Sequence, residues 1–192
     1  MTYYRDLDVC DYIFGRSRSG PRLTAASAAR LRAAGWLSVS EAYVRGNIGQ
    51  QERDRLEALL RKAWQPVFYK GCHTCELCSE ARSIYNLFIP GREVVFVSPE
   101  GILHYIDRHQ YLPPREFLDA VMGCPEMGSQ AYFAALIQAG GQEFAEVAGL
   151  IAATPTPCPY CGRPLITPRA KVCQYCKMDW HDPEHPRKLG AA

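Results

Sequence analysis

Both ends of the stretch from Cys72 to His109 carry side chains that bind metal, and this stretch decides the fold. It begins Cys72-His73-Thr74-Cys75-Glu76-Leu77-Cys78 and ends His104-Tyr105-Ile106-Asp107-Arg108-His109. Cys75 and Cys78 are separated by two residues, and His104 and His109 by four, within the range that structural zinc sites use. A thiolate turn, a β-hairpin and a helix with two imidazoles would then meet at one ion. We therefore predict a two-Cys, two-His zinc site with a treble-clef-like arrangement.

The choice of ligands leaves one alternative, because Cys72 and Cys75 have the same spacing as Cys75 and Cys78. We prefer the second pair, since Cys72 has the character of a strand-to-turn junction. A site of three thiolates and one imidazole that includes Cys72 is the main competitor. Residues five apart on an ideal helix point about 140° away from each other, so His104 and His109 can share an ion only if the helix loosens at His109. Four protein ligands would leave no open coordination position, which is typical of a structural site.

A second group of thiols lies near the C-terminus and consists of two C-x2-C pairs. Its members are Cys158, Cys161, Cys173 and Cys176. This spacing predicts two zinc knuckles facing each other in a zinc ribbon, whose folding free energy comes from the metal because the module is too small for a core. We interpret Trp180, His181 and His185 as a cap on the ribbon rather than as further ligands. The chain should thus hold two Zn²⁺ ions.

The order of apolar and polar residues predicts an α+β protein with a mainly helical domain at residues 1–153 and a zinc-ribbon module at residues 154–192. The Thr-Pro repeat at 154–157 is the expected linker. Apolar periodicity, Pro and Gly predict helices at 24–34, 50–64, 99–110 and 113–122, and two helical pieces around Gly140-Gly141 within 129–153. Strands are expected at 67–70, 84–89 and 93–97, the last two forming a hairpin around Pro90-Gly91.

Composition and charge limit the classes of protein to which this chain can belong. The 192 residues are 47% hydrophobic and 22% charged, and the N-terminus has no apolar core of a secretory signal. The longest helix-like apolar run, 131–137, is too short to cross a bilayer, so we expect a cytoplasmic protein without a membrane partner. The formal net charge is +2, and a tetrathiolate zinc site would bring the loaded protein close to neutrality, which weakens the case for nucleic acid.

Known catalytic motifs are missing from the sequence. It contains no H-E-x-x-H, no phosphate loop and no G-x-S-x-G. The P-C-x-x-C at 157–161 lacks the H-x-E half of a zinc deaminase signature. Cys124 before Pro125 could be a nucleophile with His104 or His109 as its base, but we interpret it as a buried structural thiol. We expect no catalytic residues.

The segment 71–121 resembles an uncharacterised family of small bacterial proteins. The resemblance rests on His73-Thr74-Cys75-Glu76-Leu77-Cys78, Asn86-Leu87-Phe88-Ile89-Pro90, the run His104 to His109, and Tyr111-Leu112-Pro113-Pro114-Arg115-Glu116-Phe117. Tyr3-Tyr4-Arg5-Asp6-Leu7 and Gly35-Trp36-Leu37 are similar to its N-terminal portion. The resemblance covers most of residues 1–122, implies Cys75, Cys78, His104 and His109 as ligands, and implies no activity.

These observations favour a non-enzymatic zinc-binding interaction protein of adaptor, accessory or immunity type that binds a protein partner. One alternative is nucleic-acid binding through the ribbon and the arginines of 16–32 and 53–62, which would weaken steeply with salt. A second alternative is a zinc-dependent hydrolase, if His109 is not a ligand and water completes the central site.

Overall fold

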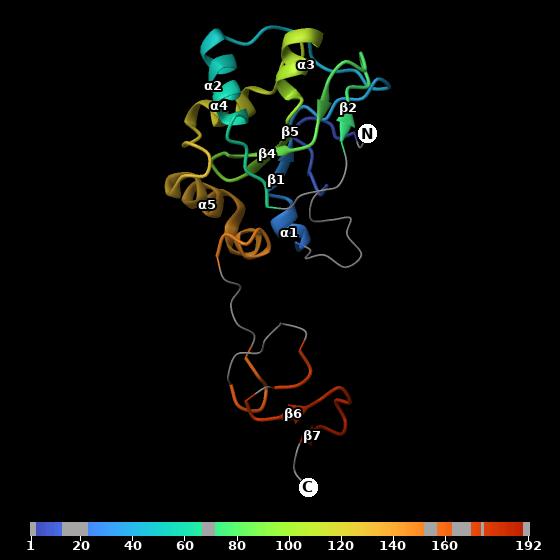
Figure 1. Cartoon of the computed structure of the whole chain (residues 1–192), viewed down its shortest axis with the longest axis vertical. Coiled ribbons are helices and arrows are strands. Elements are labelled where there is room, and N and C mark those ends of the chain that lie inside the picture. The colour runs from blue at the N-terminus through green and yellow to red at the C-terminus, as the bar shows by residue number, and fades with distance from the viewer. Residues whose placement is uncertain are drawn as a thin grey trace. The chain divides into compact units, whose positions relative to one another are not determined.

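The computed structural model describes residues 3–12, 23–66, 72–151, 157–162, 170–173 and 175–189. The chain forms two compact units, residues 1–151 and residues 152–192, and each is described by itself. Helices and small sheets are combined in the described residues (Figure 1), so the protein is of the α+β class. The strand expected at 67–70, and the expected linker except Pro157, lie outside the described residues.

A three-stranded sheet lies at the centre of the first unit. The strands β4 (Asn86–Pro90) and β5 (Val95–Pro99) form an antiparallel hairpin in which Phe88 faces Val97. The Gly91 N–H donates to the Val94 carbonyl at 2.8 Å and closes the turn. The predicted hairpin is therefore confirmed, with its second strand two residues further along the chain.

The helix predicted at 24–34 is wrong over most of its length. A single turn, α1 (Ala25–Ala28), is followed by the strand β1 (Leu31–Ala33), which pairs in parallel with β5 so that the sheet order is β1-β5-β4. Leu31 and Ala33 are buried on either side of a half-buried arginine. Pairing with β5 and burial of these side chains outweigh a weak local helix preference, because propensities amount to less than about 1 kcal/mol per residue.

The described residues also form four helices longer than α1. They are α2 (Gln50–Leu60), α3 (Ile102–His109), α4 (Arg115–Gly123) and α5 (Gln130–Val147). Helices α4 and α5 contact β4, and α2 contacts α3 and α4 (Figure 1). Two buried side chains donate hydrogen bonds to backbone carbonyls of the sheet. The Trp36 Nε1–H donates to the Val97 carbonyl of β5 at 2.8 Å, and the Tyr132 hydroxyl of α5 donates to the Phe88 carbonyl of β4 at 2.7 Å.

Helix α5 is interrupted where the sequence predicted two helical pieces. Gly141 has φ 82° and ψ 176°, which is outside the helical region and accessible mainly to glycine. The preceding Gly140 lies against the buried ring of Phe144. The Gly-Gly pair thus allows both the change of direction and the close approach of the ring.

Each unit also contains a pair of two-residue strands. In the first unit, β2 (His73–Thr74) pairs with β3 (Arg82–Ser83), and the turn between them carries Cys75 and Cys78. In the second unit, β6 (Met178–Asp179) pairs with β7 (Arg187–Lys188). Among the described helices, none has both the length and the apolar character that a bilayer crossing requires.

Candidate metal centres

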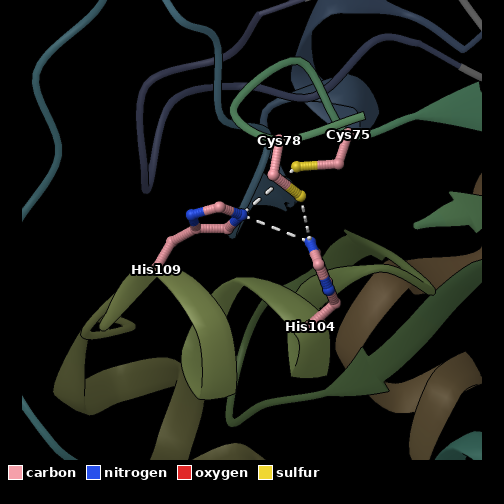
Figure 2. A group of neighbouring side chains, drawn as sticks. All are labelled: Cys75, Cys78, His104 and His109. Atoms are coloured by element: carbon pink, nitrogen blue, oxygen red, sulfur yellow. Dashed lines mark hydrogen bonds between the residues drawn. The ribbon is translucent and has the colours of Figure 1, made fainter. Parts of the chain in front are cut away.

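Four side chains converge in the first unit between the cysteine turn and helix α3 (Figure 2). The Cys75 Sγ lies 3.4 Å from the His109 Nε2, and the Cys78 Sγ lies 3.3 Å from the His104 Nε2. The two Nε2 atoms are 3.2 Å apart. All four atoms lie within 4.8 Å of one another. These residues form the central cluster, and they could hold a metal ion.

The cysteine turn is held by backbone hydrogen bonds and one left-handed residue. The Cys75 N–H donates to the Ala81 carbonyl at 2.8 Å, and the Ser79 N–H donates back to the Cys75 carbonyl at 2.8 Å. Ser79 has φ 62°. The chain therefore reverses tightly enough for both thiols to face the helix.

The end of α3 brings the two imidazoles together. His109 is the last helical residue, and Gln110 follows with φ 55° and ψ 31° in the left-handed region. The Gln110 N–H donates to the Tyr105 carbonyl, and the Tyr111 N–H donates to the same carbonyl at 3.1 Å. The helix ends at His109, one residue before the predicted end at residue 110, and this end lets the two side chains meet.

Burial shifts the pKa of two members of the central cluster, Cys75 and His109. Desolvation raises the pKa of the Cys75 thiol. Desolvation, followed by the proximity of His104, lowers the pKa of His109 and favours its neutral imidazole, the form that binds metal. A bound divalent cation would offset the cost of a buried thiolate, so this donor set fits a metal ion better than it fits a solvent-filled gap.

The competing ligand Cys72 lies outside the central cluster. Its thiol is exposed, and the Arg82 Nη2 donates to its Sγ at 2.8 Å. The candidate nucleophile Cys124 is also outside the cluster: its buried thiol donates to the Pro125 carbonyl at 3.3 Å, and desolvation raises its pKa to about 11. A thiol held neutral in this way is a poor nucleophile.

The sequence did not reveal the roles of Ser38, Tyr43 and His73 beside the central cluster. The Glu76 carboxylate accepts from the Ser38 hydroxyl at 3.0 Å, and the His109 carbonyl accepts from the Tyr43 hydroxyl at 3.2 Å. Burial lowers the pKa of His73, whose Nε2 is the one buried side-chain polar atom among the described residues without a hydrogen-bond partner. No local spacing in the sequence signals the contacts of Ser38 and Tyr43 or the burial of His73.

The second unit contains the C-terminal cluster of Cys158, Cys161, Cys173 and Cys176, whose Sγ atoms also lie within 4.8 Å of one another. Cys158 and Cys176 are 3.7 Å apart, and so are Cys161 and Cys173. Backbone N–H donors of Cys176 and Tyr175 contribute to lowering the pKa of Cys173 to about 6, the first of them most strongly. Cys173 therefore favours the thiolate, which is the metal-binding form.

Trp180 packs against the buried Cys158 and Cys173 and covers that side of the cluster. His181 and His185 lie outside the four-thiol group and pair instead with Asp179 and Asp182, at 2.7 Å and 3.1 Å. The cluster therefore consists of thiols, with an aromatic side chain as its neighbour.

A family model for a domain of unknown function, DUF7919, matches residues 2–122. This chain belongs to that family. The DUF7919 region includes the central cluster and ends before the C-terminal cluster, and the family carries no assigned activity. This agrees with the expected membership of an uncharacterised family. No curated protein and no solved structure matches the chain.

Proposed function

We propose that this DUF7919 protein is a non-enzymatic interaction protein whose two units are each held by a structural zinc ion. In this proposal Cys75, Cys78, His104 and His109 bind one ion in a treble-clef-like centre. The four C-terminal cysteines bind the second ion in a zinc ribbon. The observation that carries the proposal is the spacing of the ligand atoms.

The distances between ligand atoms match a tetrahedron around zinc. With Zn–S near ~2.3 Å and Zn–N near ~2.0–2.1 Å, the edges are about 3.8 Å between two sulfurs, about 3.5 Å from sulfur to nitrogen and about 3.3 Å between two nitrogens. The corresponding distances are 3.7 Å in the C-terminal cluster, and 3.3–3.4 Å and 3.2 Å in the central cluster. A mixed set of two thiolates and two imidazoles favours zinc, whereas four thiolates also suit iron.

A structural role follows from the number of ligands. Each cluster supplies four side chains, so a tetrahedral ion would have no position left for water or substrate. The hydrolase alternative requires that His109 stay away from the ion. The short distances from its Nε2 to the Cys75 Sγ and the His104 Nε2 argue against that requirement.

The basic side chains of α2, and of Arg61 and Lys62 directly after it, form contacts within the protein, which weakens the nucleic-acid alternative. Arg53 forms two hydrogen bonds with the Asp107 carboxylate, at 3.0 Å and 2.7 Å, and Arg61 pairs with Glu57 at 3.0 Å. Lys62 pairs with Glu126, and Arg55 donates to the Cys124 carbonyl. Cations that are already paired within the protein contribute less attraction for phosphates.

Elemental analysis of the purified full-length protein tests the metal assignment. We expect two zinc ions per chain and no visible absorption from iron. In the native protein the exposed Cys72 should react at once with a thiol reagent, and chelation should expose six further thiols because Cys10 and Cys124 are buried. One zinc ion, with Cys75 and Cys78 reactive from the start, would overturn the assignment of the central cluster.

Affinity purification under native conditions tests the partner assignment. We expect a protein that co-purifies with the wild type at high salt and is lost when Cys78 is replaced by serine. Co-purification that disappears with nuclease treatment or with added salt would instead favour the nucleic-acid alternative.

A further inference from the structure

The first unit contains a cleft that neither metal cluster uses. Its volume is about 640 Å³, which is in the range of small-molecule binding sites. Phenol rings and aliphatic side chains form its walls, and a few charged groups face it. Its lining residues include Tyr3, Arg5, Asp6, Ser38, Glu41, Tyr43 and Arg115.

Asp6 is a half-buried ionisable group of this cleft. Its Oδ1 accepts from the Gly35 N–H at 2.9 Å and from the Tyr111 hydroxyl at 2.8 Å. Both bonds end on the same oxygen, and among the described residues no donor reaches Oδ2. The carboxylate is therefore fixed in place and keeps acceptor capacity for a ligand.

The remaining charges of the cleft leave it with a preference for cations. Arg115 is already paired with Glu52 at 2.6 Å and with Asp119 at 2.6 Å, and neither acid lines the cleft. Glu41 adds a second carboxylate, and Arg5 is exposed to solvent. Because a half-buried charge is screened less than an exposed one, Asp6 outweighs Arg5.

The walls suit the apolar part of an organic cation. Tyr3 and Tyr43 present phenol rings to the cleft. The ring of Tyr43 already holds one guanidinium, that of Arg45, whose Cζ lies 5.3 Å from the ring centroid. Aromatic faces attract cations most strongly where water is excluded.

We propose that this cleft binds an organic cation, an ammonium or guanidinium group on an aliphatic stem, with the Asp6 carboxylate as its counter-ion. The cation could belong to a small amine or to a lysine or arginine side chain of a protein. The cleft lies wholly within the first unit and needs no metal for its charge.

The central cluster is connected to two walls of the cleft. Ser38, which lines the cleft, donates to Glu76 between the two cysteine ligands. Tyr43 donates to the carbonyl of His109. An ion at the central cluster would therefore fix both walls, and removing it should weaken cation binding. This step alone rests on the proposed metal function.

Calorimetric titration of the full-length, metal-loaded protein tests the proposal. The probes are n-butylguanidinium, n-butylammonium, and end-capped Gly-Arg-Gly with end-capped Gly-Gln-Gly as the neutral control. We expect the cations to bind and the glutamine peptide to bind at least about tenfold more weakly. Tighter binding of the arginine peptide than of n-butylguanidinium would identify a protein side chain as the ligand, and the reverse order would identify a small amine.

The variant Asp6→Asn removes the charge while its amide oxygen can still accept from Gly35 and Tyr111. It should weaken cation binding about tenfold or more, and Asp8→Asn, an exposed residue outside the cleft, should not. If Asp6→Asn fails to fold, the variant Glu41→Gln at an exposed residue replaces it, and it should weaken cation binding a few-fold.

Equal binding of cationic and neutral peptides, or equal loss of binding in Asp6→Asn and Asp8→Asn, would overturn the cation site. Unchanged binding after chelation would overturn the metal coupling alone.

Discussion

The Nε2 atoms of His104 and His109 lie 3.2 Å apart although the two residues are five positions apart in the chain. On a continuing helix their side chains would diverge by about 140°. They meet because α3 ends at His109 and the backbone of Gln110 turns into the left-handed region, with φ 55°. The conformation of one residue that is not a ligand therefore controls the central cluster.

Substitutions at Gln110 should reveal this control. Gln110→Gly should leave the free energy of unfolding unchanged or raise it by up to about 1 kcal/mol, because glycine adopts the left-handed conformation without strain. Gln110→Val should lower it by about 1–2 kcal/mol, because a β-branched residue is strained there. Urea unfolding of the metal-loaded protein measures both. Equal stability of the two variants would mean that the left-handed residue does not matter.

Serine substitutions should separate the competing thiol ligands. Cys75→Ser removes an Sγ of the central cluster and should reduce the bound metal from two ions per chain to one. Cys72→Ser is the matched control: its thiol is exposed and contacts Arg82, so the metal content should stay at two. Elemental analysis of both variants gives the answer, and loss of metal from Cys72→Ser would restore the three-thiolate alternative.

The glycines of α5 and α4 should respond in opposite directions to alanine. A Cβ at Gly140 would overlap the buried ring of Phe144, so Gly140→Ala should destabilise the first unit by about 1–3 kcal/mol. At Gly123 a Cβ would meet no atom within 4 Å, so Gly123→Ala should be neutral or stabilising by up to about 1 kcal/mol. Thermal unfolding compares them, and a neutral Gly140→Ala would mean that α5 can shift away from the ring.

The stability contribution of Asp6 should depend on pH. Desolvation raises its pKa above the ordinary value of 3.8, against the lowering effect of the Gly35 and Tyr111 hydrogen bonds. A carboxyl whose pKa is raised on folding stabilises the folded state below its unfolded pKa, and this contribution is lost as the pH rises through the folded pKa. The free energy of unfolding of Asp6→Asn relative to the wild type should therefore increase with pH in that window and be constant above it.

A second variant checks the cause of this pH dependence. Tyr111→Phe removes a hydrogen bond that lowers the pKa of Asp6, so the window should extend to higher pH than in the wild type. Urea unfolding at a series of pH values measures all three proteins. A pH-independent difference between Asp6→Asn and the wild type would contradict the raised pKa.

Several local features could be predicted from the sequence because each depends on neighbours in the chain. The two-residue gaps of the cysteine pairs predict tight thiol turns, Pro90-Gly91 predicts the hairpin, and Gly140-Gly141 predicts the break in α5. In each case backbone geometry over a few residues limits the outcome, so the residue types were sufficient.

Other features depended on partners far along the chain. Residues 31–33 became a strand because β5, more than 60 residues away, offered hydrogen bonds and burial. Cys78 rather than Cys72 lies beside His104 because the pairing of β2 with β3 orients the turn between these strands. The Tyr111 hydroxyl donates to Asp6 across 105 positions of the chain and so fixes a carboxylate that lines the cleft.

The sequence by itself thus determined the donor atoms and the local turns, since spacing limits which thiols and imidazoles can share one ion. Only the tertiary structure decided which of those donors converge, which carboxylate is partly withdrawn from solvent and where the cleft lies. These outcomes depend on long-range packing and desolvation, and no short stretch of sequence specifies either.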